Sequence, residues 1–424
     1  QAGGIENGTG FWSLMSAGSW LSDGKVDTGS KPSFMGPWEK LFLGWLNHYT
    51  IKPDSGTTYS VLGPAGDANG PRAQAVVVNL PDQTVTDEYN TPYEGQYEWW
   101  GGSADNLNVS LTRDLDLTGA TSASVTAKLQ HEIEADYDYL YGEVSTNGGT
   151  SWSIVPWKTV NGDVERTGTQ GLDGSSNGAW VDLSYDLSAY QGQAVKFRFR
   201  YATDGGVHYA GAFLDNITFT KNGATVWTDT VETADSGWAN NGWKRFTGTD
   251  TRTVPHFYIA ENRTYFSYDD SLRTGPYNYG WADTKPDWVE RFSNPEGMLV
   301  WYVNYAYGDN NTSVHPGHGL VLPVDVRPGR ITVPGVGDIT NRRSSFDATF
   351  GKQKKKAITL HLQGKPVTVP AMKGVPVFDD SNPDRYWTAD NPRNSVKVAG
   401  SGTRIEVFLE ARGLSDVIVV KTTN

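Results

Sequence analysis

Apolar and polar residues alternate along much of the chain. From Val195 to Tyr201 an apolar side chain occupies every second position, and Lys or Arg fills the positions between them. A period of two places the apolar side chains on one face of an extended strand, as in an antiparallel sheet with one buried face. The same alternation appears in residues 358–362 and 405–409, and residues 146–152 (TNGGTSW) have the Asn-Gly chemistry of a tight hairpin turn. The pattern therefore predicts a mainly β fold.

One segment departs from this period and predicts a helix. Pro37 suits the first helical position, and Trp38, Leu41, Phe42 and Trp45 follow at helical spacing. These four side chains would form one apolar stripe on the helix, which a partner surface must cover.

The chain length and its turn-rich segments predict several domains. At 424 residues, a prior of one domain per ~150 residues gives about three units. Residues 63–71 are rich in Gly and Pro and read as a linker. We expect a first piece at 1–65, a jelly roll at 72–220, a second β domain at 221–330 and a β-sandwich at 331–424.

Composition narrows the classes of function. The chain has 48 acidic and 36 basic residues, a net charge of −12 and no Cys. The acidic balance disfavours a nucleic-acid partner and suits the binding of hard cations. Without Cys, a metal must be held by oxygen or His ligands, and we expect a secreted, extracellular protein. No run of apolar residues approaches the ~18 that a membrane-spanning helix needs, so no membrane span is expected.

Two predicted strands carry carboxylates on faces that should be apolar. In residues 213–219 the alternation puts Asp215 on the same face as Phe213, Ile217 and Phe219. Asp138 likewise shares a face with Leu140, in a stretch that is rich in acidic residues. Burying a neutral polar group without a hydrogen-bond partner costs ~2–7 kcal/mol, and burying an unpaired carboxylate costs more. Each of these carboxylates therefore needs a partner.

A calcium ion with ~6–8 oxygen ligands would satisfy several of these carboxylates at once. The sequence therefore predicts a structural Ca²⁺ bound by Asp138 and Asp215, with Asp136 or Glu134 assisting. The alternative is that these acids cap loops or pair with nearby arginines of the 195–201 strand.

Residues 131–135 (HEIEA) begin like the zinc-binding motif HExxH. Ala135 occupies the position of the second His, and the segment leads into a strand, where residues four apart do not share a helical face. We therefore expect no zinc protease chemistry at His131.

Several segments together resemble a known family. Residues 11–20 (FWSLMSAGSW), 35–41 (MGPWEKL), 213–216 (FLDN), 315–319 (HPGHG) and 347–350 (DATF) are similar, in this order, to the secreted bacterial immune inhibitor A metallopeptidases. The order is more specific than any one of these motifs.

The resemblance implies a zinc endopeptidase that acts on protein substrates. It implies that Met15 lies in the Met turn of a metzincin-like catalytic domain, as an apolar floor under the metal, and that a MAM-like jelly roll follows. It also implies an HExxH-x-x-G-x-x-D segment with the zinc ligands and the catalytic Glu, and no such segment occurs in these 424 residues. We therefore expect the C-terminal portion of the enzyme, inactive alone, with zinc only in the complete enzyme and an associated N-terminal catalytic fragment as a partner.

A rival interpretation comes from a different class of protein. Aromatic residues make up 12% of the chain, with 16 Trp and 21 Tyr. Aromatic-rich jelly rolls with calcium commonly bind glycans through exposed Trp and Tyr, so a non-enzymatic adhesion or carbohydrate-binding module is the alternative. The Met-turn segment favours the peptidase.

Overall fold

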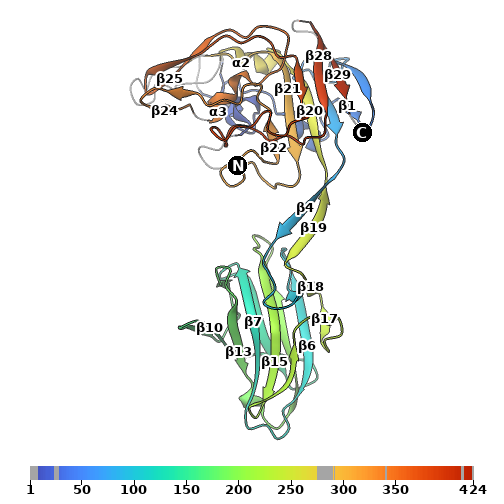
Figure 1. Ribbon diagram of the computed structural model, residues 1–424, viewed down its shortest axis with the longest axis vertical. Helices are drawn as coiled ribbons and strands as arrows, with labels where there is room; N and C mark the ends of the chain where they lie inside the picture. Colours follow the sequence, from blue (N-terminus) through green and yellow to red (C-terminus); the bar gives the residue numbers. More distant parts are fainter. Residues whose placement is uncertain are drawn as a thin grey trace. The chain divides into compact units, whose positions relative to one another are not determined.

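The computed structural model describes residues 8–22, 28–274, 290, 292–339, 341–411 and 415–422. The chain forms two compact units. The first unit contains Gln1–Val85 and Thr253–Asn424, and the second contains Thr86–Arg252. Strands β4 (Gln83–Glu88) and β19 (Thr249–Val254), which pair with each other, carry the chain into and out of the second unit (Figure 1).

The second unit is a two-sheet β-sandwich. One sheet has the order β11-β10-β13-β7-β15-β5-β18, with β12 on β7 and β16 on β15, and the other has the order β17-β6-β14-β8-β9. Its strands are β5 (Glu98–Trp100), β6 (Asn108–Asp116), β7 (Ala123–Ile133), β8 (Tyr139–Ser145), β9 (Ser153–Ile154), β10 (Trp157–Asn161), β11 (Val164–Gly168), β12 (Gly174–Ser175), β13 (Val181–Asp186), β14 (Ala194–Ala202), β15 (Gly211–Lys221), β16 (Ala224–Asp229), β17 (Ala239–Asn241) and β18 (Lys244–Phe246). A short 3-10 helix, η3, spans Ser188–Tyr190.

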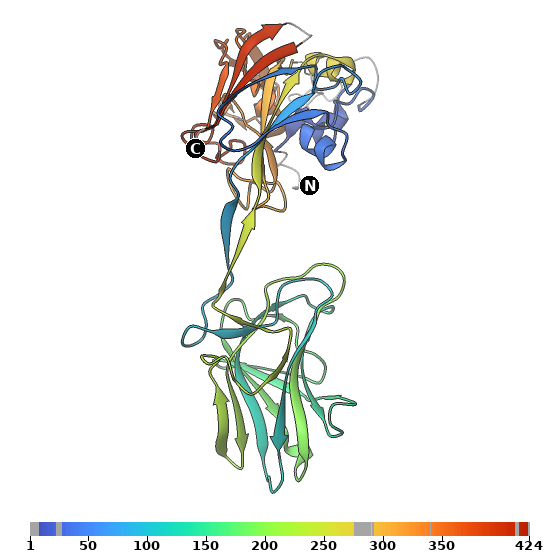
Figure 2. The ribbon, with the colours of Figure 1, turned by 90° about the vertical axis from the view of Figure 1, so that its right-hand side faces the viewer.

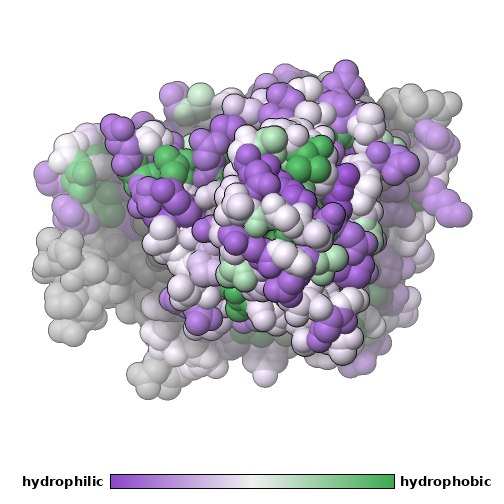
Figure 3. Space-filling view, turned by 90° about the horizontal axis from the view of Figure 1, so that it is seen from below, coloured by the Kyte–Doolittle hydropathy of each residue, from purple (hydrophilic) through white to green (hydrophobic). Residues whose placement is uncertain are grey.

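The predicted alternation of β14 is confirmed. Val195, Phe197, Phe199 and Tyr201 are buried in the core between the two sheets, and the polar residues between them are partly exposed. The predicted hairpin at 146–152 is also confirmed, since it joins the paired strands β8 and β9. At the end of the molecule that faces the viewer in Figure 3, hydrophobic residues form small separate spots among hydrophilic ones.

The first unit is built on a sheet that is buried on both faces. The order of this sheet is β1-β3-β20-β21-β22, and a second sheet has the order β2-β29-β28-β27 (Figure 2). The strands are β1 (His48–Ile51), β2 (Thr57–Leu62), β3 (Ala75–Asn79), β20 (His256–Arg263), β21 (Gly297–Asn304), β22 (Val321–Pro323), β27 (Val377–Asp379), β28 (Arg404–Ala411) and β29 (Ser415–Lys421), with small hairpins β23 (Thr332–Val333) with β24 (Gly337–Asp338) and β25 (Ile358–Leu362) with β26 (Lys365–Val369).

The central strands β20 and β21 supply both cores of the first unit. Tyr258 and Val300 pack in the core shared with the second sheet, whereas Ile259 and Trp301 pack against the N-terminal segment. Because successive side chains of a strand point to opposite faces, two neighbouring strands can serve two cores. All eight residues of each strand are accordingly buried.

The helices of the first unit are short. They are α1 (Pro37–Phe42), α2 (Ser271–Thr274) and α3 (Asn341–Ser344), with 3-10 turns η1 (Gly10–Trp12), η2 (Ala17–Trp20), η4 (Ser267–Asp270) and η5 (Ser345–Asp347). No helix of the described residues is long and apolar enough to cross a membrane.

The predicted apolar stripe on the first helix is only half correct. Trp38 and Leu41 pack against the core, but Phe42 and Trp45 are 74% and 61% exposed. The helix ends at Phe42, and Gly44 has a φ of +74°. A left-handed Gly after the last turn redirects the chain, so Trp45 leaves the stripe.

The division into units also differs from the four predicted segments. Phe11, Trp12 and Leu21 of the N-terminal segment are buried against β20 and β21, so the segment belongs to a unit whose second part begins only at Thr253. Local patterns do not reveal packing between such distant segments. Strand β16, which we placed in a separate domain after residue 220, forms a hairpin with β15 of the sandwich across Asn222 and Gly223.

His131 lies in β7, in extended and not helical backbone as predicted, and its burial should make the sandwich acid-sensitive. Its side chain is buried, and burial, with a contribution from Arg166, lowers its pKa from 6.5 to about 4. The unfolded chain therefore takes up a proton below pH 6.5 that the folded chain resists until about pH 4. Stability should fall over this range, by at most about 1.4 kcal/mol per pH unit from this group.

We predict that His131→Leu removes this component of the acid sensitivity. Urea unfolding at intervals between pH 7 and pH 4 measures it, with His48→Gln, a change at a partly exposed histidine, as the control. An unchanged pH slope in His131→Leu would show that another group is responsible.

Candidate metal sites

The structure separates the four acids that we expected around one calcium ion. Glu134 and Asp138 lie together with a third carboxylate, Asp204, and the ligand oxygens of these three residues are all within 4.8 Å of one another. Asp215 does not belong to this group. Asp136 is exposed, has a φ of +69° and donates its backbone N–H to Asp173, at 2.9 Å, so it shapes the turn beside the group.

We call Glu134, Asp138 and Asp204 the Asp138 site. Within the described residues it is the one cluster of three or more His, Cys, Asp or Glu side chains close enough to share an ion. Asp204 was missed because it lies 66 residues from Asp138 and its own neighbours, Gly205 and Gly206, suggest only a turn. The cluster contains no imidazole, so its chemistry is that of a hard cation.

Asp215 shares a face of β15 with Phe213, as predicted, but not with Ile217 and Phe219. The strand has an irregularity after Asp215, and Asn216 has a φ of +47°. Phe213 packs in a small outer cluster with Trp100, whereas Ile217 packs in the main core. A bulge inserts an extra residue and reverses the alternation, so Asp215 faces the outer cluster and not the main core.

The outer face brings Asp215 next to Glu98 and Asn90, and we call these three residues the Asp215 site. Strand β5 pairs with β15 so that Trp100 faces Phe213 and Trp99 faces Leu214. Glu98 and Asp215 are the next residues of the two strands, and the charge of Asp215 acts on Glu98. Asn90 donates its side-chain N–H to Glu98 Oε2 at 3.0 Å. Glu98 and Asp215 are both completely buried.

Two buried oxygens of the Asp215 site have no hydrogen-bond donor. These are Glu98 Oε1 and Asn90 Oδ1. Asp215 is better satisfied, because it accepts hydrogen bonds from the backbone N–H groups of Glu94, at 3.1 Å, and Asn216, at 2.7 Å. A cation between these oxygens would supply the missing interaction.

The electrostatics of the Asp215 site point the same way. Burial raises the pKa of Glu98 to about 8; the Asn90 hydrogen bond opposes this rise and Asp215 adds to it. Burial raises the pKa of Asp215 to about 6, against the two backbone hydrogen bonds, and Glu94 and Glu232 add to the rise. Lys128, which lies opposite Asp215 on β7, is paired with Asp182 at 2.6 Å. Both carboxylates therefore lie where a positive charge is missing.

Met15, the predicted floor of a zinc site, lies at the surface of the first unit. Its side chain is 56% exposed, beside the buried Phe11, Trp12 and Ala17. Its backbone N–H donates to Ser13 Oγ, which in turn donates to Glu39 of α1 at 2.6 Å. The turn is thus held rigidly while its methionine faces outward.

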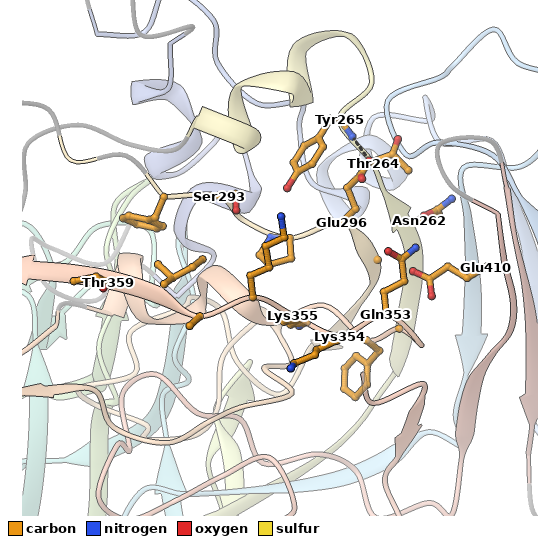
Figure 4. A pocket seen from close by; sticks show the side chains of 18 residues that line it. Asn262, Thr264, Tyr265, Ser293, Glu296, Gln353, Lys354, Lys355, Thr359 and Glu410 are labelled. Atoms are coloured by element: carbon orange, nitrogen blue, oxygen red, sulfur yellow. Dashed lines mark hydrogen bonds between the residues drawn. The ribbon is translucent and has the colours of Figure 1, made fainter. Parts of the chain in front are cut away.

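The first unit also contains a polar cleft of about 650 Å³ (Figure 4). Tyr265 donates its backbone N–H to Glu296 at 2.9 Å on one side, and Glu410 and Lys354 line another. Lys355 is buried, and its ammonium donates to the backbone carbonyls of two residues beneath the cleft, Asp347 and Thr349. The cleft carries charges of both signs and no cluster of metal ligands.

Comparison with known proteins relates the chain to two family models. Residues 65–248 match the model of the immune inhibitor A-like MAM domain, and residues 251–419 match the model of the immune inhibitor A-like metallopeptidase VEG domain. The boundary between the two matches falls next to the end of the second unit at Arg252.

Two curated relatives match most of the chain. Immune inhibitor A of Bacillus thuringiensis subsp. alesti is 32% identical over 392 residues, which are 87% of this chain and 52% of the relative. The pre-pro-metalloprotease PrtV of Vibrio cholerae serotype O1 is 28% identical over 417 residues, which are 95% of this chain and 42% of the relative. The chain thus spans about half the length of these relatives.

A third relative matches a smaller part. Bacillopeptidase F of Bacillus subtilis is 24% identical over 137 residues, 32% of this chain and 8% of the relative. Since the MAM and VEG models together cover most of the chain, and the chain aligns over most of its length with an immune inhibitor A and with a metalloprotease, the chain belongs to the immune inhibitor A-like metallopeptidase family.

Proposed function

We propose that this chain is the C-terminal accessory portion of a secreted zinc metalloendopeptidase that hydrolyses proteins, and that calcium stabilises its MAM-like unit at the Asp215 site. The names of the relatives and the two family matches support the first part. We favour the peptidase over the adhesion alternative, because the VEG-domain model and the PrtV relative are named for metalloproteases.

The observation that carries the calcium proposal is the pair of buried, donor-free oxygens on Glu98 and Asn90 beside the buried carboxylate of Asp215. All candidate ligands are oxygens, which suits calcium better than zinc. The ion would tie the segment before β5 to the middle of β15, two parts of the chain that are more than 110 residues apart.

In the complete enzyme, zinc would act as a Lewis acid on the peptide carbonyl and on its bound water. The residues of this chain would contribute support to that centre. We assign this role to the turn around Met15, because Ser13 and Glu39 fix it while its methionine side chain remains outward.

If this chain is only an accessory portion of the enzyme, the isolated chain should be inactive. Purified as the 424-residue chain, it should neither cleave casein nor retain stoichiometric zinc after dialysis, as measured by fluorescent casein hydrolysis and elemental analysis. The complete protease, prepared in the same way, is the positive control. Casein cleavage by the verified single chain would contradict the proposal.

Removal of calcium should destabilise the MAM-like unit. A ligand that binds only the folded state, at 100 times its dissociation constant, adds about 2.7 kcal/mol, so chelation with EGTA should lower the melting temperature. Glu98→Gln and Asp215→Asn keep the side-chain shape and remove the charge, and each should reduce the calcium-dependent shift. Asp163→Asn, at an exposed acid of the β10–β11 turn, is the matched control. The site is wrong if both variants keep the full wild-type shift.

Met15→Leu should be almost silent for folding. The side chain is more than half exposed and the volume is nearly conserved, so the cost should stay below ~1.5 kcal/mol. If Met15 supports the zinc centre, the same change in the complete protease should lower kcat for a peptide substrate, whereas Met35→Leu, at a partly buried methionine, should not. Equal kcat values for all three enzymes would remove Met15 from the zinc site.

A further inference from the structure

We propose that Glu134, Asp138 and Asp204 form a second Ca²⁺ site in the MAM-like unit, which is separate from the Asp215 site and does not depend on it. The site joins the turn after β7 to the loop after β14. Three observations support this site: the register of the strands, one buried oxygen without a donor, and the charges around it.

The register of two strands brings the acids together. Strand β14 pairs with β8 so that Ala202 faces Tyr139. Asp138 directly precedes β8 and Asp204 follows β14 by two residues, so the two acids meet where the pair of strands ends. Glu134 follows β7, and the backbone N–H of Asp138 donates to its carbonyl at 3.2 Å. This turn brings the carboxylate of Glu134 close to those of Asp138 and Asp204.

Asp138 is the buried ligand of this site. Its side chain has no exposed surface, and its Oδ1 accepts the backbone N–H of Asp204 at 2.9 Å. Its Oδ2 is buried without any hydrogen-bond donor. A buried carboxylate oxygen without a donor is costly unless a cation binds it, and this oxygen belongs to a residue whose ligand atom lies within 4.8 Å of two further carboxylates.

The surrounding charges do not compensate these acids. Burial raises the pKa of Asp138 against the backbone hydrogen bond from Asp204, and the charges of Asp204 and Asp105 raise it further. Of the charged side chains that act on Asp138, His208 lowers its pKa, but the Nδ1 of His208 already pairs with Asp105 at 2.7 Å. The pKa of Glu134 is raised by burial and then by Asp204, Asp138 and Asp105.

Another buried acid, in strand β8, has its charge compensated by arginines. Glu143 is nearly as buried as Asp138, but Arg198 and Arg200 of β14 pair with it at 2.6 Å and 3.1 Å. The same two strands therefore provide arginines for Glu143 and leave the acids at their ends with carboxylates as neighbours.

The geometry suits calcium better than magnesium or zinc. The three ligand oxygens lie within 4.8 Å of one another, so a single ion can reach all of them. Ca²⁺ tolerates variable oxygen geometry, whereas Mg²⁺ needs a near-ideal octahedron at ~2.0–2.1 Å. Glu134 is partly exposed and Asp204 is exposed, so water can complete the ~6–8 ligands of Ca²⁺. Zinc sites in proteins prefer nitrogen or sulfur ligands, which are absent from this group.

Calcium titration of the EGTA-treated chain by calorimetry tests the proposal. We expect two bound Ca²⁺ ions in the wild type and in the control Asp163→Asn. We expect one in Asp204→Asn, which changes an exposed side chain, or at least a tenfold weaker second site. Two ions with unchanged affinities in Asp204→Asn would overturn the proposal, as would a site that binds Mg²⁺ and not Ca²⁺.

The design separates this site from the Asp215 site. If only the Asp215 site is wrong, the wild type binds one ion and Asp204→Asn binds none, which supports the present proposal. If the present proposal is wrong and the Asp215 site is correct, Glu98→Gln loses calcium binding and Asp204→Asn does not.

A second variant distinguishes a ligand from a structural residue. Asp138→Asn removes the uncompensated buried charge and keeps the hydrogen bond from Asp204. In EGTA it should melt at or above the wild-type temperature, and added calcium should raise its melting temperature less than that of the wild type. An equal fall of the melting temperature with and without calcium would overturn the role of Asp138 as a ligand.

Discussion

The compensation of buried carboxylates is the constraint on which the two units depend. In the first unit, the buried guanidinium of Arg263 pairs with both Glu261 and Asp269, at 3.3 Å and 3.0 Å, so each of these buried carboxylates has a positive charge beside it. In the second unit, Glu143 has its two arginines. Asp138 and Glu98 are buried to the same degree, and each has an oxygen without a donor. Because neither carboxylate has an ion pair with Arg, Lys or His in the part of the chain that the structure describes, we assign their compensation to cations.

The two proposed calcium sites would stabilise the sandwich at places where its hydrogen-bond ladders are weakest. The Asp215 site lies at the bulge of β15, and the Asp138 site lies beyond the ends of β8 and β14. A bound ion at each place would replace contacts that the ladder cannot make. Such ions would stabilise the sandwich without disulfides, which a chain with no Cys cannot form.

The first unit has a different proposed role, which is to support the zinc centre of the complete enzyme. Its N-terminal segment covers one face of the sheet through Phe11, Trp12 and Leu21, while Met15 remains half exposed. A single piece of chain thus completes the core of the VEG-type unit and presents the turn that we assign to the zinc centre. Packing of this turn against β20 and β21 would transmit the rigidity of a doubly buried sheet to that centre.

The sequence by itself determined the β class, the hairpin at 146–152 and the non-helical backbone at His131, since strand period and turn chemistry are local properties of the chain. The family followed separately, from the resemblance of several motifs that occur in order along the chain. It also identified Asp138 and Asp215 as carboxylates in apolar surroundings. It did not determine which acids meet. Asp204 and Glu98 joined them only through strand register, and the bulge at Asn216 moved Asp215 to the outer face. Only the tertiary structure decided these points, because register and bulges depend on pairing between segments that are distant in the sequence.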